Sequence, residues 1–351
     1  MLHGIKTIAI PPGETIREQL ADRGLNQKEF ALRMGMTEKH ISHLINGKVE
    51  LTHDVALRLE SVLGVPARFW NSLEANYRED LARVTVEKTM ERDEVIAAKM
   101  PYTRISSWKW IPETKNIQEK VFNLRAFFEV ACLELLDKLE IPGIAYRKAG
   151  TNDAGDYIRA CWAQKARLEA RKITVKPINI DMLKKSIPAI RILTVQPPKF
   201  FCDRLRETMS ECGVAMVFLP NIEGSFLHGA SFVDGKRIVI GLTVRGKYAD
   251  KFWFSLFHEL HHVIEGHIYK DMNFEERERA ADIFAQDVLI PGKDFRDFIL
   301  KKDFRKESIV SFAQRIGIAP GIALGRLQKE NYVKYNRHME LKQKYEIAAV
   351  N

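Results

Sequence analysis

One pattern near residue 260 constrains the fold of this chain more than any other feature. His258, Glu259 and His262 form H-E-x-x-H, and a strongly apolar stretch, residues 252–257, leads into it. The same pattern occurs by chance on surface helices, but this stretch is too apolar for a solvated helix. Residues four apart share one helical face, so His258 and His262 can present their imidazoles to one metal ion. Glu259 then lies beside the open position of the ion, where it can accept a proton from a metal-bound water.

A catalytic zinc ion usually has three protein ligands, so a third must follow. The candidates are His267 and Glu278, while a continuation H-x-x-G-x-x-H fails because Gly266 and His267 each lie one position away from it. Glu278 and Asp282 share one helical face, so one can be a ligand and the other can receive the free N–H of a ligand histidine. The predicted Zn²⁺ site therefore consists of the ligands His258, His262 and Glu278, the supporting carboxylate Asp282 and the catalytic base Glu259.

The same residues carry a family resemblance. The stretch from His258 to His262, followed by residues 278–285 and 288–291, resembles the ImmA/IrrE family of zinc metallo-endopeptidases, which are gluzincin-like proteases that cleave transcriptional repressors. The resemblance implies zinc-dependent hydrolysis of peptide bonds in a protein substrate. One departure is His261, where the family usually has Gly. We expect a side chain there either to crowd the cleft or to add a hydrogen-bond donor.

Residues 1–78 have the pattern of a helix-turn-helix domain. Asn26 and Thr37 are expected to cap successive helices, and Gly35 allows the turn between them. Outward polar residues of the helix that Thr37 begins can reach base edges, and flanking residues can face phosphates. The expected DNA contacts are Gln27, Thr37, Lys39, His40, Ser42, His43 and Lys48, with Gln27 and Lys48 at phosphates. A short three-helix cap with solvated polar faces would show the same pattern.

This part of the chain also has a family resemblance. Residues 12–48, continued by residues 51–60 and by Phe69-Trp70, resemble XRE-family and HigA-type antitoxin DNA-binding domains. The resemblance covers nearly all of residues 10–78. It implies that the protein binds double-stranded operator DNA as a homodimer.

Composition limits the remaining possibilities. The 351 residues suffice for two or three domains, and 46% hydrophobic with 29% charged residues is ordinary for globular protein. No apolar run reaches the ~18 residues of a membrane span, and residues 1–10 lack the features of a signal peptide. We therefore expect a cytoplasmic protein without a membrane partner. Four scattered cysteines indicate neither a disulfide framework nor a thiolate metal site.

Net charge does not locate the DNA-binding surface. The chain carries +9, but the excess lies mainly in residues 79–200, with 22 Lys and Arg against 16 Asp and Glu. That segment predicts a charged connector helix over residues 76–100, an apolar core helix over 117–139 and a helix with basic residues over 156–172. We expect the basic face of the last helix to be solvated, although contact with a DNA backbone is the alternative.

Three strands are predicted before the metal pattern, over residues 214–219, 226–232 and 237–242. Residues 226–231 are the candidate edge strand that pairs with a substrate backbone, with Gly229 letting that backbone approach. His228 or Arg245 is a candidate to polarise the scissile carbonyl. The pattern of residues 308–328 predicts a second pair of helices joined by a turn, and we expect this pair to pack against the core.

These patterns together predict a multidomain, mainly α protein with a small β-sheet. Residues 1–78 form an all-α helix-turn-helix domain, residues 79–195 a helical connector and middle region, and residues 196–351 an α+β zincin-like peptidase domain with a helical tail. The expected function is DNA-binding transcriptional regulation joined to zinc-dependent proteolysis of a repressor or antitoxin-type protein, itself or a partner. The alternative is an antitoxin or repressor whose peptidase-like domain is a sensor or scaffold.

Overall fold

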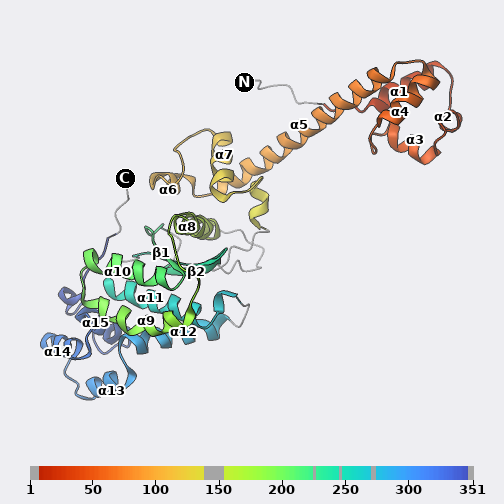
Figure 1. The fold of residues 1–351 in the computed structure, drawn as a ribbon. Helices are drawn as coiled ribbons and strands as arrows, with labels where there is room; N and C mark the ends of the chain where they lie inside the picture. The colour runs from red at the N-terminus through yellow and green to blue at the C-terminus, as the bar shows by residue number, and fades with distance from the viewer. Residues whose placement is uncertain (1–7, 138–153, 224–226, 245–246, 270–273, 347–351) are drawn as a thin grey trace. The chain divides into compact units, whose positions relative to one another are not determined.

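The computed structural model of the chain describes residues 8–137, 154–223, 227–244, 247–269 and 274–346. Helices dominate, and three strands form one small sheet (Figure 1), which confirms the predicted fold class. The chain divides into two compact units, of which the first ends at Val95 and the second begins at Ile96. The predicted boundary at residue 78 falls inside one continuous helix, α5 (Ala67–Lys99). The division at residues 78 and 195 therefore stays a proposal.

The first unit packs five helices around one core. These are α1 (Pro12–Asp22), α2 (Gln27–Met34), α3 (Glu38–Ile45), α4 (His53–Leu63) and the beginning of α5. The predicted caps are confirmed: the Asn26 side chain accepts from the N–H of Glu29, and Thr37 Oγ1 accepts from the N–H of His40 at 3.2 Å. Gly35 ends α2 at φ +64°, a left-handed conformation that glycine adopts at little cost. Local capping therefore sets the start and end of the helices on either side of the turn.

The second unit surrounds a sheet with strand order β1-β3-β2. Strand β1 (Val214–Phe218) runs parallel to the central β3 (Arg237–Leu242), and β2 (Gly229–Asp234) pairs with β3 antiparallel at the edge. The helices of this unit are α6 (Tyr102–Ser107), α7 (Ile117–Phe128), α8 (Ala154–Ala170), α9 (Ile180–Ile192), α10 (Pro198–Glu211), α11 (Ala249–Ile264), α12 (Phe274–Leu289), α13 (Gly292–Leu300), α14 (Lys306–Ile316) and α15 (Pro320–Lys329).

Two glycines show that helices cover both faces of this sheet. A side chain at Gly241 would meet the Trp162 ring of α8, and one at Gly229 would meet Glu259 of α11. Gly229 pairs with Leu242, and Gly241 is the next residue along β3, so the two glycines point to opposite faces. Helix α8 therefore covers one face and α11 the other. The buried apolar residues of α11 join α12, α14 and α15 in one core, which confirms that the tail packs inward.

Arginines from two distant helices hold the end of α12. Arg191 of α9 donates to the carbonyls of Val288 and Leu289 at 2.7 and 3.0 Å. Arg326 of α15 donates to the carbonyl of Ile290 at 2.8 Å. The last carbonyls of a helix lack intrahelical partners, so these guanidinium groups satisfy them and fix the position of α12.

Some predicted elements differ from the structure. The core helix predicted over residues 117–139 ends at Phe128, because Glu129 takes a left-handed conformation (φ 57°), and a short 3₁₀ turn follows at Leu133–Asp137. The second strand begins at Gly229 instead of residue 226 and continues to Asp234; residues 224–226 lie outside the described part.

Basic residues in α8 and directly after it face neighbouring carboxylates. Arg171 pairs with Glu129 and Asp234, and Lys165 pairs with Glu169. These intramolecular ion pairs favour a structural role for the helix over contact with a DNA backbone.

Within the described residues, no single helix has the length and apolar composition to cross a membrane, although α14 and α15, joined by a 115° bend, meet that test as a pair.

Candidate metal centre and helix-turn-helix surface

Helices α11 and α12 bring the three predicted ligands together. Nε2 of His258 lies 3.0 Å from Nε2 of His262, and the two Glu278 carboxylate oxygens lie 3.3 Å from these nitrogens, one from each. Ligand atoms in a tetrahedral zinc site, with bonds of about 2.0–2.1 Å, stand roughly 3.3 Å apart. The observed spacing therefore fits a zinc ion.

The protonation states also fit a cation. Nδ1 of His258 lies 3.0 Å from Asp282 Oδ1, so it can donate a proton there, and this contact holds the ring with Nε2 toward Glu278. Hydrogen bonds from His258 and His262 hold the pKa of the Glu278 carboxyl well below its usual range. Burial lowers the pKa of His258, but the nearby carboxylates of Glu278, Glu259 and Asp282 together outweigh burial and raise that pKa overall. Both shifts have the direction expected where carboxylates surround a position that a cation can occupy.

Glu259 is enclosed beside these residues. Its side chain is 8% exposed, and Ser231 Oγ on β2 donates to its Oε2 at 2.7 Å. Burial raises the pKa of Glu259, while the Ser231 hydrogen bond lowers it. A Cβ at Gly229 would lie 2.9 Å from Glu259 Cγ, so the glycine makes room for this side chain. The approach of a substrate backbone at Gly229 stays a prediction. Ser231 could not be identified as a site residue from local pattern, because an isolated serine in a strand is common.

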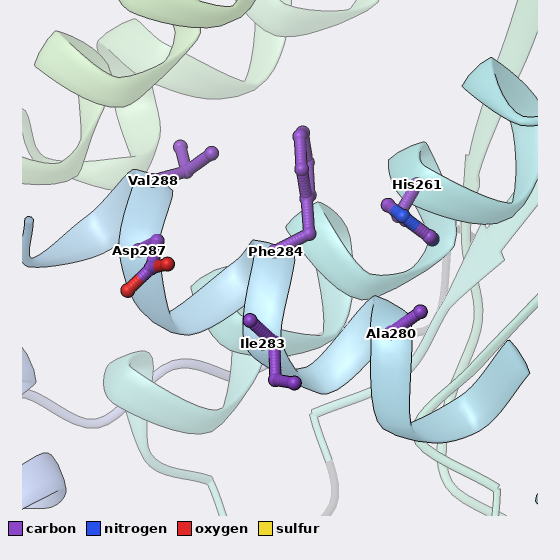
Figure 2. Close-up of a pocket in the computed structure, with 6 residues that line it drawn as sticks. All are labelled: His261, Ala280, Ile283, Phe284, Asp287 and Val288. Atoms are coloured by element: carbon purple, nitrogen blue, oxygen red, sulfur yellow. The ribbon is translucent and has the colours of Figure 1, made fainter. Parts of the chain in front are cut away.

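His261 lies beside the ligand cluster but is not one of its three predicted ligands. Its ring packs at 5.1 Å from the ring of Phe284 and borders a hollow of about 560 Å³ (Figure 2). The hollow is also lined by the α12 residues Ala280, Ile283, Phe284, Asp287 and Val288. At about 100° per residue, these residues lie on the side of α12 opposite Glu278 and Asp282. The hollow therefore lies on the side of α12 away from the metal cluster.

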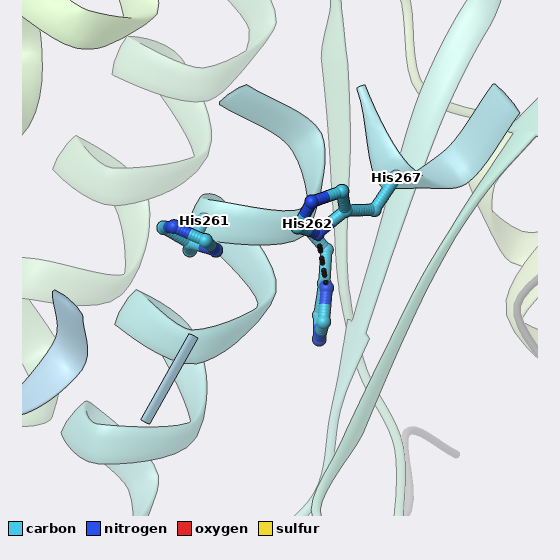
Figure 3. A group of neighbouring side chains, drawn as sticks. All are labelled: His261, His262 and His267. Atoms are coloured by element: carbon cyan, nitrogen blue, oxygen red, sulfur yellow. Dashed lines mark hydrogen bonds between the residues drawn. The ribbon is translucent and has the colours of Figure 1, made fainter. Parts of the chain in front are cut away.

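His267 cannot be the third ligand of this cluster. Its Nδ1 lies 3.1 Å from Nδ1 of His262, on the far side of that ring from Nε2 (Figure 3). His261, His262 and His267 also offer nitrogens within 4.8 Å of one another. A neutral His262 has only one lone pair, so it cannot serve both clusters. The cluster that contains the carboxylate is the better cation site.

Arg245 and His228 are the candidates to polarise the scissile carbonyl. Arg245 lies outside the described residues. His228 contributes its backbone carbonyl to a hydrogen bond from the N–H of Thr243 at 3.0 Å, which extends the pairing of β2 and β3.

The predicted DNA contacts lie on and beside α3. Ile41, Leu44 and Ile45 face the core, which leaves the polar residues of α3 at the surface. Gln27, Thr37, Lys39 and Lys48 are exposed, and His40, Ser42 and His43 are half-buried. Nε2 of His40 is itself buried, so among the half-buried residues His40 is the least free to reach DNA.

Each of the two units contains a match to a known protein family. Residues 16–70 match the helix-turn-helix family model, and residues 217–328 match the model of the IrrE N-terminal-like domain, a peptidase family. The uncharacterized HTH-type transcriptional regulator YddM of Escherichia coli (strain K12) is 32% identical over 76 residues, which are 22% of this chain and 81% of that relative. The chain belongs to the XRE-type helix-turn-helix regulators and carries an IrrE-like domain.

A solved structure also matches a part of this regulator. It is an addiction module antidote protein of the HigA family from Coxiella burnetii, 26% identical, with a TM-score of 0.22, and the match covers 25% of this chain and 95% of that one. The helix-turn-helix match contains every predicted DNA contact, and the IrrE-like match contains the metal cluster, Glu259 and Ser231.

Proposed function

We propose that the IrrE-like domain is a zinc-dependent endopeptidase, and that it cleaves a regulatory protein of repressor or antitoxin type. The observation that carries this proposal is the placement of a buried carboxylate beside three converging ligand atoms. His258, His262 and Glu278 hold the ion, and Asp282 keeps the lone pair of His258 aimed at it. When bound, zinc supplies a Lewis acid that polarises the scissile carbonyl and acidifies a water.

The remaining chemistry belongs to Glu259. Ser231 occupies Oε2, so Oε1 is the oxygen left to take the proton of the attacking water and to return it to the leaving amine. The outer edge of β2 offers N–H and C=O groups to an extended peptide, which would lie beside the cluster because Gly229 contacts Glu259. The edge strand thus aligns the substrate while Glu259 moves the proton.

The test combines metal content with cleavage. Purified protein loaded with zinc is incubated with the proteome of its host, and new N-termini are mapped. We expect the parent to create specific cuts and Glu259→Gln to create none while it keeps its zinc. His262→Ala and Glu278→Ala should lose zinc. Full zinc retention in both would refute the ligand set, cuts by Glu259→Gln would refute the base, and a parent without cuts would favour the sensor or scaffold function.

We also propose that the regulator binds operator DNA in the cytoplasm as a homodimer, with α3 in the major groove. Ser42 and His43 then face base edges, together with Lys39 and, near the start of the helix, Thr37 and His40, while Gln27 and Lys48 face phosphates. Half-sites should lie about 34 Å apart.

Selection from randomised DNA tests the readout. Ser42→Ala or His43→Ala should change the preferred bases. Lys48→Ala should weaken all sequences alike and lower the salt dependence of binding. If the Ser42 and His43 variants select the same sequence as the parent, α3 does not read bases directly.

A further inference from the structure

The two ligand histidines are supported differently. Nδ1 of His258 faces a carboxylate, Asp282, at 3.0 Å. Nδ1 of His262 faces another imidazole nitrogen, Nδ1 of His267, at 3.1 Å (Figure 3). A ligand histidine usually donates its second N–H to an acceptor that fixes the ring, so His267 stands where such an acceptor is needed.

Only one position of the proton between Nδ1 of His262 and Nδ1 of His267 is consistent with metal binding by Nε2 of His262. A neutral imidazole has one N–H and one lone pair, and the lone pair of His262 must lie on Nε2 if that atom binds the ion. Nδ1 of His262 then carries the proton and donates it to Nδ1 of His267, whose own proton must lie on Nε2. We propose that His267 is a positioning residue, a neutral acceptor that fixes the ring and tautomer of His262. This inference rests on the proposed zinc site.

A specific turn brings His267 to this position. In a continuous helix, residue 267 would lie about 140° around the axis from His262 and could not face its ring. Helix α11 instead ends at Ile264, and Gly266 adopts φ +70°, which starts the short helix His267–Tyr269. The N–H of Tyr269 donates to the carbonyl of Gly266 at 3.1 Å and closes the turn. The glycine conformation thus folds His267 back over His262.

The identity of the acceptor sets the charge of the site. A zinc ion together with the carboxylates of Glu278, Asp282 and the base Glu259 has a formal charge of −1. A carboxylate behind His262 would add a further negative charge and weaken the pull of the ion on a substrate carbonyl. A neutral imidazole orients the ligand without this charge.

Three variants of the full chain test the inference. His267→Phe keeps a flat ring but removes the acceptor, and His267→Asn restores an acceptor oxygen near the place of Nδ1. His261→Phe is the matched control, because the His261 ring also packs against His267 but its Nδ1 has no hydrogen-bond partner. Zinc affinity is measured by chelator competition, and the Nδ1 proton of His262 is followed by NMR in the zinc-loaded protein.

We expect His267→Phe to bind zinc about 10- to 100-fold more weakly, and to expose the Nδ1 proton of His262 to rapid exchange. His267→Asn should restore both readouts, and His261→Phe should leave both unchanged. Parent-like zinc affinity in His267→Phe, or equal loss in His261→Phe, would overturn the inference. His262→Ala separates it from the proposed function: if that variant loses zinc while His267→Phe does not, only the role of His267 falls, whereas parent-like zinc binding by His262→Ala removes the zinc site itself.

Discussion

Replacing Gly229 by alanine should displace the proposed catalytic base without touching a metal ligand. The added Cβ would lie 2.8 Å from a methyl carbon of Leu242, 2.9 Å from Glu259 Cγ and 3.1 Å from Glu259 Oε1. Ordinary contacts between such atoms are about 3.5–4.0 Å. Relief of the clash therefore requires movements of roughly half an ångström or more, shared by the strand and the Glu259 side chain.

Two consequences of this shift have expected sizes. Overpacking of a buried site typically costs about 1–3 kcal/mol of stability. A misplacement of ~1 Å in a catalytic group can cost about 100-fold in rate. We expect Gly229→Ala to lower kcat by between 10- and 100-fold, while its zinc content equals that of the parent because His258, His262 and Glu278 are unchanged.

Gly241→Ala is the matched control. Its Cβ would lie 2.7 Å from the Trp162 ring, on the opposite face of the same sheet, so it should cause comparable strain away from Glu259. The assay measures urea unfolding, zinc content and kcat on a peptide that contains a mapped cleavage site. The reasoning is refuted if Gly229→Ala cleaves like the parent, or if Gly241→Ala loses as much activity.

Three further outcomes can be checked. Thr37→Ala removes the cap of α3 and should lower unfolding stability by about 1 kcal/mol, measured by urea denaturation. Ser231→Ala removes a hydrogen bond that favours the charged form of Glu259, so the acid limb of the pH profile of kcat/KM should move to higher pH. A hydrogen bond from Arg171 holds the pKa of Asp234 below its usual value. The charged Asp234 therefore stabilises the folded protein above the unfolded-state pKa of about 3.9, and this stabilisation is lost as the pH falls through the lower pKa of the folded state. Asp234→Asn should therefore destabilise the protein at pH 7, and urea titrations should show this difference vanish in acid.

Local chemistry explains which parts of the structure could be predicted. The caps at Asn26 and Thr37 depend on neighbours within three residues, and His258 and His262 converge because they are four apart on a helix. Glu278 could be found because its helix also carries Asp282 at the spacing that the site needs. Such features require only sequence distance and helical geometry.

The parts that could not be predicted depend on tertiary contacts. Ser231 and Gly229 matter because β2 lies against α11, which no local pattern encodes. The role of His267 requires the turn at Gly266, and the early end of α7 requires Glu129 to adopt a conformation that periodicity cannot show. A glycine within a strand therefore cannot be linked to a catalytic side chain on a distant helix from the sequence alone.

The contacts of Arg191 and Arg326 with the end of α12 have a consequence for protein synthesis. Ribosomes make the N-terminal helices first, and domains generally fold as units while synthesis continues. The helix that carries Glu278 receives the Arg326 contact only when α15, which follows α12 in the chain, has been made. A nascent chain can therefore complete its DNA-binding domain well before its ligand cluster is fixed.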